Sequence, residues 1–194
     1  MMATTHRLGG LAAGVAMAGL LQADLYETGV IVTGAVLGSL LPDIDNPHSS
    51  ISRRWQLTSF FITLGQGVIR LFSKLLPRKQ AGYINSMIGH RGITHSLMAV
   101  CLLPVPVILL GRASGYLSAG IYGALSISAG ILSHILFDML AGGAPLFMPF
   151  TTKRIVIAKI KTGGLLEWIF RGFLIVIFLY FGMEGIAWQE LLQV

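Results

Sequence analysis

"YLSAGIYGALSISAGILSHILFDMLA", residues 116–141, is the longest apolar run in the chain. It contains no lysine or arginine, and its single histidine and single carboxylate, His134 and Asp138, lie near its end. A helix needs about 20 apolar residues to cross the hydrocarbon core of a bilayer. The run therefore predicts a membrane-spanning helix that carries two ionisable groups close to one membrane surface.

The composition of the whole chain agrees with this prediction. The chain has 194 residues, of which 54% are hydrophobic and only 11% are charged. Soluble domains have about 25% charged residues, so this chain lacks the charge that a soluble surface requires. We found no repeat, linker or low-complexity tract. We therefore expect an integral membrane protein with a single domain over residues 1–194.

Four further apolar runs, residues 8–23, 28–42, 94–111 and 165–183, are candidate spans. The first two are short, and their glycines suit close contact between helices in lipid. The first run could alternatively be a signal peptide, because Arg7 precedes it. Small residues fill it throughout and Ala23 is a poor cleavage position, so we expect a retained helix.

Residues 59–76 form a different kind of segment. Apolar residues such as Phe60, Leu64 and Leu71 recur at helical spacing, with Arg70 and Lys74 on the opposite side. This pattern predicts an amphipathic helix that lies in the membrane interface. The alternative is a sixth span with Arg70 turned inward. The predicted fold class is all-α: a polytopic membrane helical bundle with about five transmembrane helices and one interfacial amphipathic helix.

The basic residues predict an orientation. If the N-terminus is cytoplasmic and 59–76 lies flat, only Arg112 of the 14 lysines and arginines falls on the outer side. This distribution follows the positive-inside rule. The net charge of +6 is then a consequence of topology, and nothing indicates a nucleic-acid partner. Between the last two runs, "TTKRIVIAKIKTGG" (151–164) is rich in β-branched residues and predicts a short hairpin or an extended loop.

Histidines and aspartates gather at the same predicted membrane face. In the topology above, every one of them lies at the cytoplasmic end of its helix: His6, Asp43, Asp45, His90, His95, His134 and Asp138. Lysine and arginine alone determined that topology, so the coincidence is independent evidence that four helices bring these groups into one layer.

Each motif also has a purely structural interpretation. "PDID" (42–45) could be a turn stabilised by its aspartates. Thr94 could be the N-cap of the helix that follows it. His134 and Asp138, four residues apart on one helix face, could satisfy each other's hydrogen bonds. Arg91 could be an anchor for lipid headgroups.

A divalent cation would explain better why so many histidines and aspartates gather at one membrane face. An ionisable group at the centre of a span costs roughly 2.5–3.5 kcal/mol on insertion scales, and less near its ends. Imidazole and carboxylate are ligands for divalent metals, and positions i and i+4 of a helix can share one ion. The single cysteine, Cys101, excludes a cysteine-based zinc site within one chain. We predict one or two ions, zinc first, with manganese as an alternative.

Asp45 and Arg91 are the candidates for catalysis. Asp45, or Asp43 in its place, could bridge two metals or accept a proton from a metal-activated water, and Arg91 could orient an anionic substrate such as a phosphate. Thr94 and Ser96 could orient the imidazoles. The remaining histidine, His48, follows Pro47, and we expect it to be a solvated loop residue.

The motifs resemble one bacterial family. A histidine at the start of the first helix, "LPDIDNPHS", "GHRGITHSL" and "HILFDML" followed by "PLFMPF" are similar to the YdjM-type family of membrane-bound, metal-dependent hydrolases, from His6 to about Lys161. The resemblance implies a bacterial inner-membrane location and a more distant relation to zinc-dependent phospholipase C. It also implies a set of metal-site positions: His6, Asp43, His90, His95, His134 and Asp138.

The functional hypothesis combines these inferences. We expect a metal-dependent hydrolase that cleaves a phosphoester of a lipid or membrane-associated substrate at the cytoplasmic interface, with membrane lipids as its surroundings. The alternative is a metal-stabilised membrane scaffold or regulator without catalysis. A metal transporter would need ligands near the bilayer midplane, which the sequence does not provide. The oligomeric state is unknown.

Overall fold

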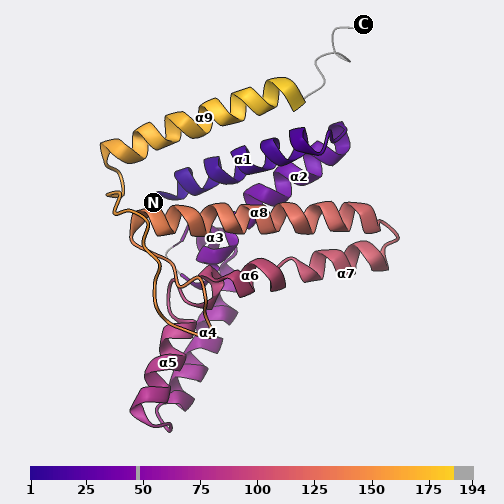
Figure 1. Cartoon of the computed structure of the whole chain (residues 1–194). Coiled ribbons are helices and arrows are strands. Elements are labelled where there is room, and N and C mark those ends of the chain that lie inside the picture. The colour runs from indigo at the N-terminus through magenta and orange to yellow at the C-terminus, as the bar shows by residue number, and fades with distance from the viewer. Residues whose placement is uncertain (47–48, 186–194) are drawn as a thin grey trace, which may run out of the picture.

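The long helices of the protein pack side by side. The computed structural model describes residues 1–46 and 49–185, and in it α1 (Ala3–Leu20), α2 (Leu25–Gly38), α8 (Leu117–Ala141) and α9 (Leu165–Gly185) form a bundle (Figure 1). Helix α8 packs against both α1 and α2, and α1 also packs against α9. Each apolar run predicted from the sequence is mostly helical. Three segments are long and apolar enough to cross a membrane: Leu25–Asp45, Leu117–Ala141 and Leu165–Gly182.

Small residues allow the central helices to approach closely. A Cβ atom at Gly38 would overlap the backbone of Ile127, and one at Gly130 would overlap the backbone of Ala35. These contacts agree with the role predicted for the glycines of α2, although Gly29 faces open space. The isoleucines on the same side of α8, Ile127, Ile131 and Ile135, form the adjacent buried core with Val100.

The predicted span 94–111 is interrupted. It consists of the one-turn helix η2 (Ile93–His95), α6 (Leu97–Leu102) and α7 (Val105–Ala113). Pro104 and Pro106 lie at and just beyond the break, where their missing N–H groups and rings prevent a continuous helix. Helix α7 packs against α8, and the turn between them, which contains Ser114, is at the end of the bundle opposite the N-terminus (Figure 1).

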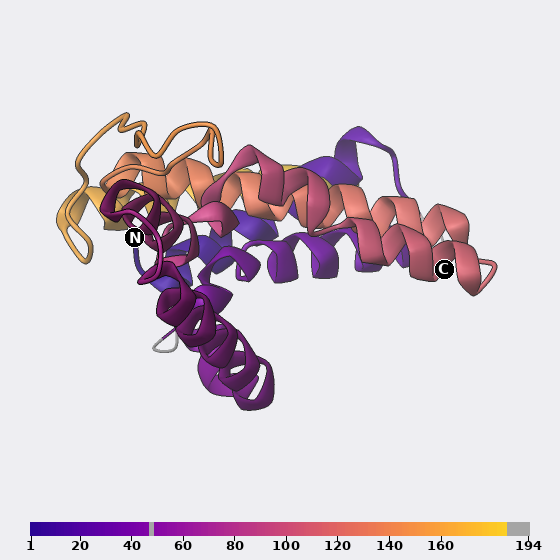
Figure 2. The ribbon, with the colours of Figure 1, turned by 90° about the horizontal axis from the view of Figure 1, so that it is seen from below.

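The amphipathic segment forms a hairpin that leaves the bundle. Helix α2 ends in the short helix η1 (Leu41–Asp45), where Pro42 is at the first turn, and α3 (Ser50–Arg54) leads into α4 (Gln56–Ser73) and α5 (Arg78–Ile88). Both views show α4 and α5 projecting at a steep angle to the long helices (Figures 1 and 2). Helix α4 exposes Phe60, Phe61 and Leu64 and is not among the three candidate spans.

Residues 143–164 form an extended loop at the end of the bundle where the chain begins (Figure 1). One antiparallel bridge joins Ala144 to Ile155, and the backbone N–H groups of Ile157 and Ile160 donate to carbonyls in the last turns of α8. The expectation of an extended loop is confirmed. No regular strand is present in the described ranges 1–46 and 49–185.

Candidate metal centre

Four chain segments bring ionisable side chains together at one end of the bundle. Helix α1 supplies His6, η1 supplies Asp43, η2 supplies His95, and α8 supplies His134 and Asp138. The positions 134 and 138 lie on the face of α8 that is buried in the bundle, because residues four apart on a helix point the same way. The three histidines and Asp138 are each at most 3% exposed.

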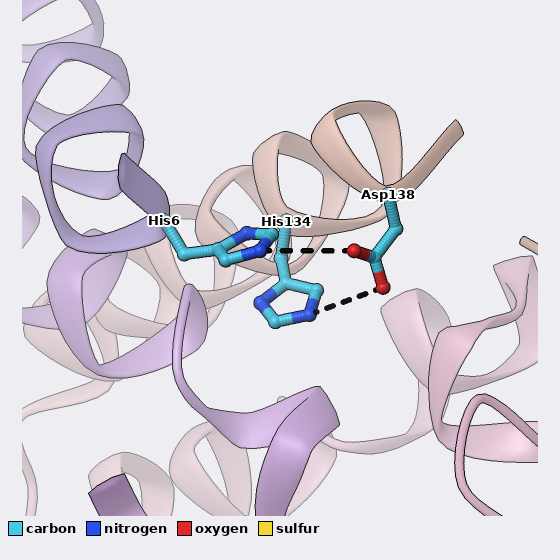
Figure 3. Close-up of side chains that lie close together, drawn as sticks. All are labelled: His6, His134 and Asp138. Carbon is cyan, nitrogen blue, oxygen red and sulfur yellow. Dashed lines mark ion pairs between the residues drawn. The ribbon is translucent and has the colours of Figure 1, made fainter. Parts of the chain in front are cut away.

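Asp138 is the centre of the cluster. Its Oδ2 lies 3.3 Å from Nε2 of His95 and 3.7 Å from Nε2 of His134, and its Oδ1 lies 3.7 Å from Nε2 of His6. Figure 3 shows His6 and His134 converging on this carboxylate from α1 and α8. The two imidazoles are stacked, with ring centroids 3.8 Å apart.

A second carboxylate faces two of the same histidines. Oδ1 of Asp43 lies 3.7 Å from Nε2 of His134 and 3.8 Å from Nε2 of His95. Two groups of ligand atoms result, each within 4.8 Å: His6 with His134 and Asp138, and Asp43 with His95 and His134. Because His134 belongs to both groups, the residues could hold one shared ion or two neighbouring ions.

Hydrogen bonds determine which nitrogen of His134 faces the cluster. Its Nδ1 lies 2.7 Å from the backbone carbonyl oxygen of Ser39, which follows the last turn of α2 and has no intrahelical partner there. A carbonyl can only accept, so Nδ1 carries the proton and donates it. In the neutral imidazole, Nε2 then presents a lone pair to Asp43 and Asp138.

His95 is oriented by a side-chain relay. The Thr94 hydroxyl donates to Oδ2 of Asp45 at 2.7 Å, because a carboxylate can only accept, and its oxygen lies 2.9 Å from Nδ1 of His95. Nδ1 of His95 then donates to Thr94, and its Nε2 presents a lone pair. Metal-bound histidines are held in this way by an acceptor on their other nitrogen.

The inward nitrogens have no hydrogen-bond partner. Among the described residues, Nε2 of His95 and Nε2 of His134 are buried side-chain atoms without one. On His6 it is the other ring nitrogen, Nδ1, that is buried without a partner. In a dry site, a nitrogen lone pair and a carboxylate oxygen that face each other repel unless a positive charge lies between them. Two ligands about 2.0–2.2 Å from a tetrahedral zinc lie about 3.3–3.6 Å apart. The observed nitrogen–oxygen separations of 3.3 to 3.8 Å are equal to this or slightly wider. The residues therefore fit a metal ion.

The local charge also acts on the protonation of His95, which lies in η2, outside the three long apolar segments. Burial lowers the pKa of its imidazole, but the nearby carboxylates of Asp138 and Asp43 outweigh burial and raise the pKa above the ordinary value of 6.5. A proton on His95 and a metal ion would therefore compete for the same place between the carboxylates.

Arg91 contacts the cluster directly. Its Nη2 donates to Oδ1 of Asp138 at 2.8 Å, while its Nε is buried without a hydrogen-bond partner. The amino group of Met1 lies 3.8 Å from the same oxygen. Arg91 has a φ of 57°, a left-handed conformation that is uncommon for residues other than glycine. Its side chain is 21% exposed, so Arg91 joins the buried cluster to the surface.

His90 and Asp45 lie beside the cluster. Nδ1 of His90 is 3.5 Å from Oδ1 of Asp45, and the side chain of His90 is 49% exposed. Neither residue belongs to the two groups of ligand atoms found among the described residues. Their predicted roles, metal ligand for His90 and ligand or base for Asp45, stay predictions. His48 falls outside the described residues.

One buried network was not foreseen from the sequence. Glu167 and Arg171, four residues apart near the start of α9, are 0% and 9% exposed. Glu167 accepts from the hydroxyl of Thr5 and the backbone N–H of Met2, and Arg171 donates to the hydroxyls of Thr4 and Thr5. The network ties α9 to the first turn of α1, next to His6. The sequence signal for this network was the presence of two opposite charges, Glu167 and Arg171, inside the apolar run 165–183.

Comparisons with known proteins agree with the family resemblance. The model of the family described as YdjM inner membrane protein matches residues 1–192. Inner membrane protein YdjM of Escherichia coli (strain K12) is 34% identical over 131 residues, which cover 67% of this chain and 53% of the relative. The protein of the same name from Shigella flexneri matches to the same extent.

The chain thus spans about half the length of the curated relatives it matches. No solved structure matches the chain significantly, and the predicted likeness to zinc-dependent phospholipase C stays a prediction. The family match extends over nearly the whole sequence, and it includes every segment that supplies the cluster. The protein is therefore a membrane protein that belongs to the YdjM inner membrane protein family.

Proposed function

We propose that the protein is a metal-dependent hydrolase that cleaves a phosphoester of a lipid or membrane-associated substrate. The observation that carries the proposal is the pair of buried Nε2 atoms without a hydrogen-bond partner, on His95 and His134, close to the carboxylates of Asp43 and Asp138. Zinc suits this nitrogen and oxygen donor set, and manganese is the alternative. When bound, such an ion polarises the phosphoester and activates water at neutral pH.

The residues beside the cluster have distinct roles in this proposal. Arg91 has five N–H donors, and its pairing with Asp138 leaves donors for a phosphate. Asp45 holds Thr94, and through it His95, in the ligand orientation. His90, half exposed and next to Asp45, is placed to transfer a proton to or from a substrate that enters past it.

The basic residues support an orientation for the same proposal. The loop 143–164, with Lys153, Arg154, Lys159 and Lys161, lies at the end of the bundle where the chain begins, whereas Arg112 is near the opposite turn (Figure 1). By the positive-inside rule, the metal centre and the N-terminus face the cytoplasm of a multi-pass protein.

The orientation can be tested by labelling with a membrane-impermeant maleimide, after replacing Cys101 with serine. We expect Ser114→Cys to be labelled in intact spheroplasts, and Lys159→Cys only after lysis. Both positions are exposed. The reverse pattern would place the metal centre on the outer side.

The activity is tested on protein purified in detergent. Zinc and manganese are measured by mass spectrometry, and hydrolysis is assayed with phospholipids and with a chromogenic phosphodiester. We expect His134→Ala and Asp138→Asn to lose both metal and activity. Arg112→Gln, a substitution of an exposed residue at the opposite end of the bundle, should retain both. Wild-type protein that binds no metal would refute the proposal.

A non-catalytic metal-stabilised scaffold is the second candidate. It is favoured by the burial of the ligand nitrogens. In the part of the cluster that the structure describes, only Asp43 and Arg91 give partial access to the surface, with side chains 26% and 21% exposed. Stoichiometric metal together with no turnover of any phosphoester tested would support this scaffold role and exclude the hydrolase.

A further inference from the structure

A hollow of about 330 Å³ lies where α1, α2 and α3 meet, and none of the candidate metal ligands lines it. Two arginines, Arg7 and Arg54, share this hollow with Trp55 and with four apolar residues, Val36, Leu37, Leu40 and Ile51. Within residues 1–46 and 49–185, no carboxylate forms an ion pair with either guanidinium. The hollow thus combines two unpaired cations with an apolar wall, which suits a ligand that has an anionic head and an apolar body.

A second hollow, of about 360 Å³, continues along the same side of the two helices. On α1 it is lined by Leu11, Val15 and Ala18, which follow Arg7 at intervals of three or four residues. On α2 and the turn that follows it, the residues lining both hollows repeat with the same spacing from Leu25 to Leu40. Positions spaced in this way lie on one helix face. The two hollows therefore follow a single seam between α1 and α2, which α9 borders with Phe178 and Phe181.

The length of the seam matches one leaflet of a membrane. Arg7 and Ala18 are eleven residues apart on α1, which corresponds to about 16 Å at 1.5 Å per residue. Half of the hydrocarbon core of a bilayer is about 15 Å thick. The cationic hollow lies at the end of the bundle that carries the metal centre, because Arg7 follows His6 directly. Trp55, 47% exposed, is at the same end, and tryptophan favours the membrane–water interface.

We propose that this seam is a binding site for one anionic phospholipid of the adjoining leaflet. The phosphate lies between Arg7 and Arg54, and an acyl chain follows the seam past Gly29 toward Ala18. Two guanidiniums against one phosphate leave a positive excess, so a headgroup with a net negative charge is preferred over a zwitterionic one. The proposal does not depend on hydrolysis at the metal centre.

Gly29 provides a steric test that leaves the helix packing intact. A Cβ atom at this position meets no atom within 4 Å, whereas one at Gly14, on the packed side of α1, would press on the backbone of Val32. Gly29→Phe therefore fills the seam without forcing α1 and α2 apart. Gly172→Phe on α9 is the matched control, because Gly172 is also open and lines neither hollow.

The experiment measures lipid bound to detergent-purified protein by native mass spectrometry, with phosphatidylglycerol or phosphatidylcholine added in mixed micelles. We expect phosphatidylglycerol to bind with about tenfold preference, and Arg7→Gln combined with Arg54→Gln to remove about that factor. Gly29→Phe should weaken binding as well. Arg53→Gln, an exposed arginine outside the hollow, and Gly172→Phe should bind like the wild type.

Three outcomes would overturn the proposal. The first is equal binding of the two lipids, and the second is unchanged binding by both the double arginine variant and Gly29→Phe. The third is complete displacement of the lipid by millimolar inorganic phosphate, which would identify a site for a free anion. None of these measurements depends on metal content or turnover as its readout, so their failure leaves the proposed hydrolase to be judged separately.

Discussion

The relay from Asp45 through Thr94 to His95 allows a sharp test of the metal centre. Thr94→Val keeps the shape of the side chain but removes the hydroxyl that donates to Asp45 at 2.7 Å and faces Nδ1 of His95 at 2.9 Å. Both partners are buried, Asp45 at 7% and His95 at 0% exposure, so water cannot easily replace the hydroxyl.

The expected magnitude follows from these two contacts. A hydrogen bond to a charged group contributes about 1.5–3 kcal/mol, and one between neutral groups about 0.5–1.5 kcal/mol, so the variant should lose about 2–4.5 kcal/mol of stability. Without an acceptor for its Nδ1 proton, His95 also loses the preference for a bare Nε2. Removing such a supporting partner typically weakens metal affinity about 10- to 100-fold.

The assay is a competition titration of zinc against a chromophoric chelator, combined with the thermal unfolding midpoint in detergent. Thr94→Ser, which keeps the hydroxyl, should retain most of the affinity, and Thr58→Val, at an exposed position of α4, should behave as the wild type. Wild-type zinc affinity in folded Thr94→Val would refute the relay, and so would an equal loss in Thr94→Ser.

Three further predictions concern pH and packing. Zinc affinity should rise from pH 6 to pH 8, because the carboxylates raise the pKa of His95 and its proton must leave before Nε2 can bind; a pH-independent titration would contradict this. Glu167→Ala should lower the free energy of unfolding by about 3–5 kcal/mol, because Arg171 stays buried without its carboxylate partner. The thermal unfolding midpoint should fall in this variant and stay unchanged in the exposed control Lys161→Ala. Gly38→Ala should lower the free energy of unfolding by about 1–3 kcal/mol, because its Cβ meets the backbone of Ile127. Gly29→Ala faces open space, so its unfolding midpoint should be no lower than that of the wild type.

Several elements could be predicted from local sequence because their cause is local. The run 116–141 became α8 almost residue for residue, and the amphipathic pattern of 59–76 appears as α4 over Gln56–Ser73. The convergence of His6, Asp43, His95, His134 and Asp138 followed from topology, since each lies near the same end of its segment. Pro104 in the sequence is a signal for the break. The prediction of one span over 94–111 rested on apolar composition alone and did not use that signal.

Other features depend on contacts between distant segments. No local pattern indicates that His134 donates to the Ser39 carbonyl, since 95 residues separate them. The placement of His90 at the rim, next to Asp45 rather than in the cluster, depends on how its loop docks on η1. The Glu167–Arg171 network likewise exists only because α9 packs against the first turn of α1.

The amino-acid sequence by itself determined the membrane class, the helical runs, the amphipathic helix and the layer in which the ionisable groups meet. These follow from composition, periodicity and charge, which act on each segment independently. Only the tertiary structure decided which nitrogens face inward, which carboxylates they share, and where the seam beside Arg7 runs. Such choices depend on hydrogen bonds and close contacts whose partners become neighbours only after the helices have packed.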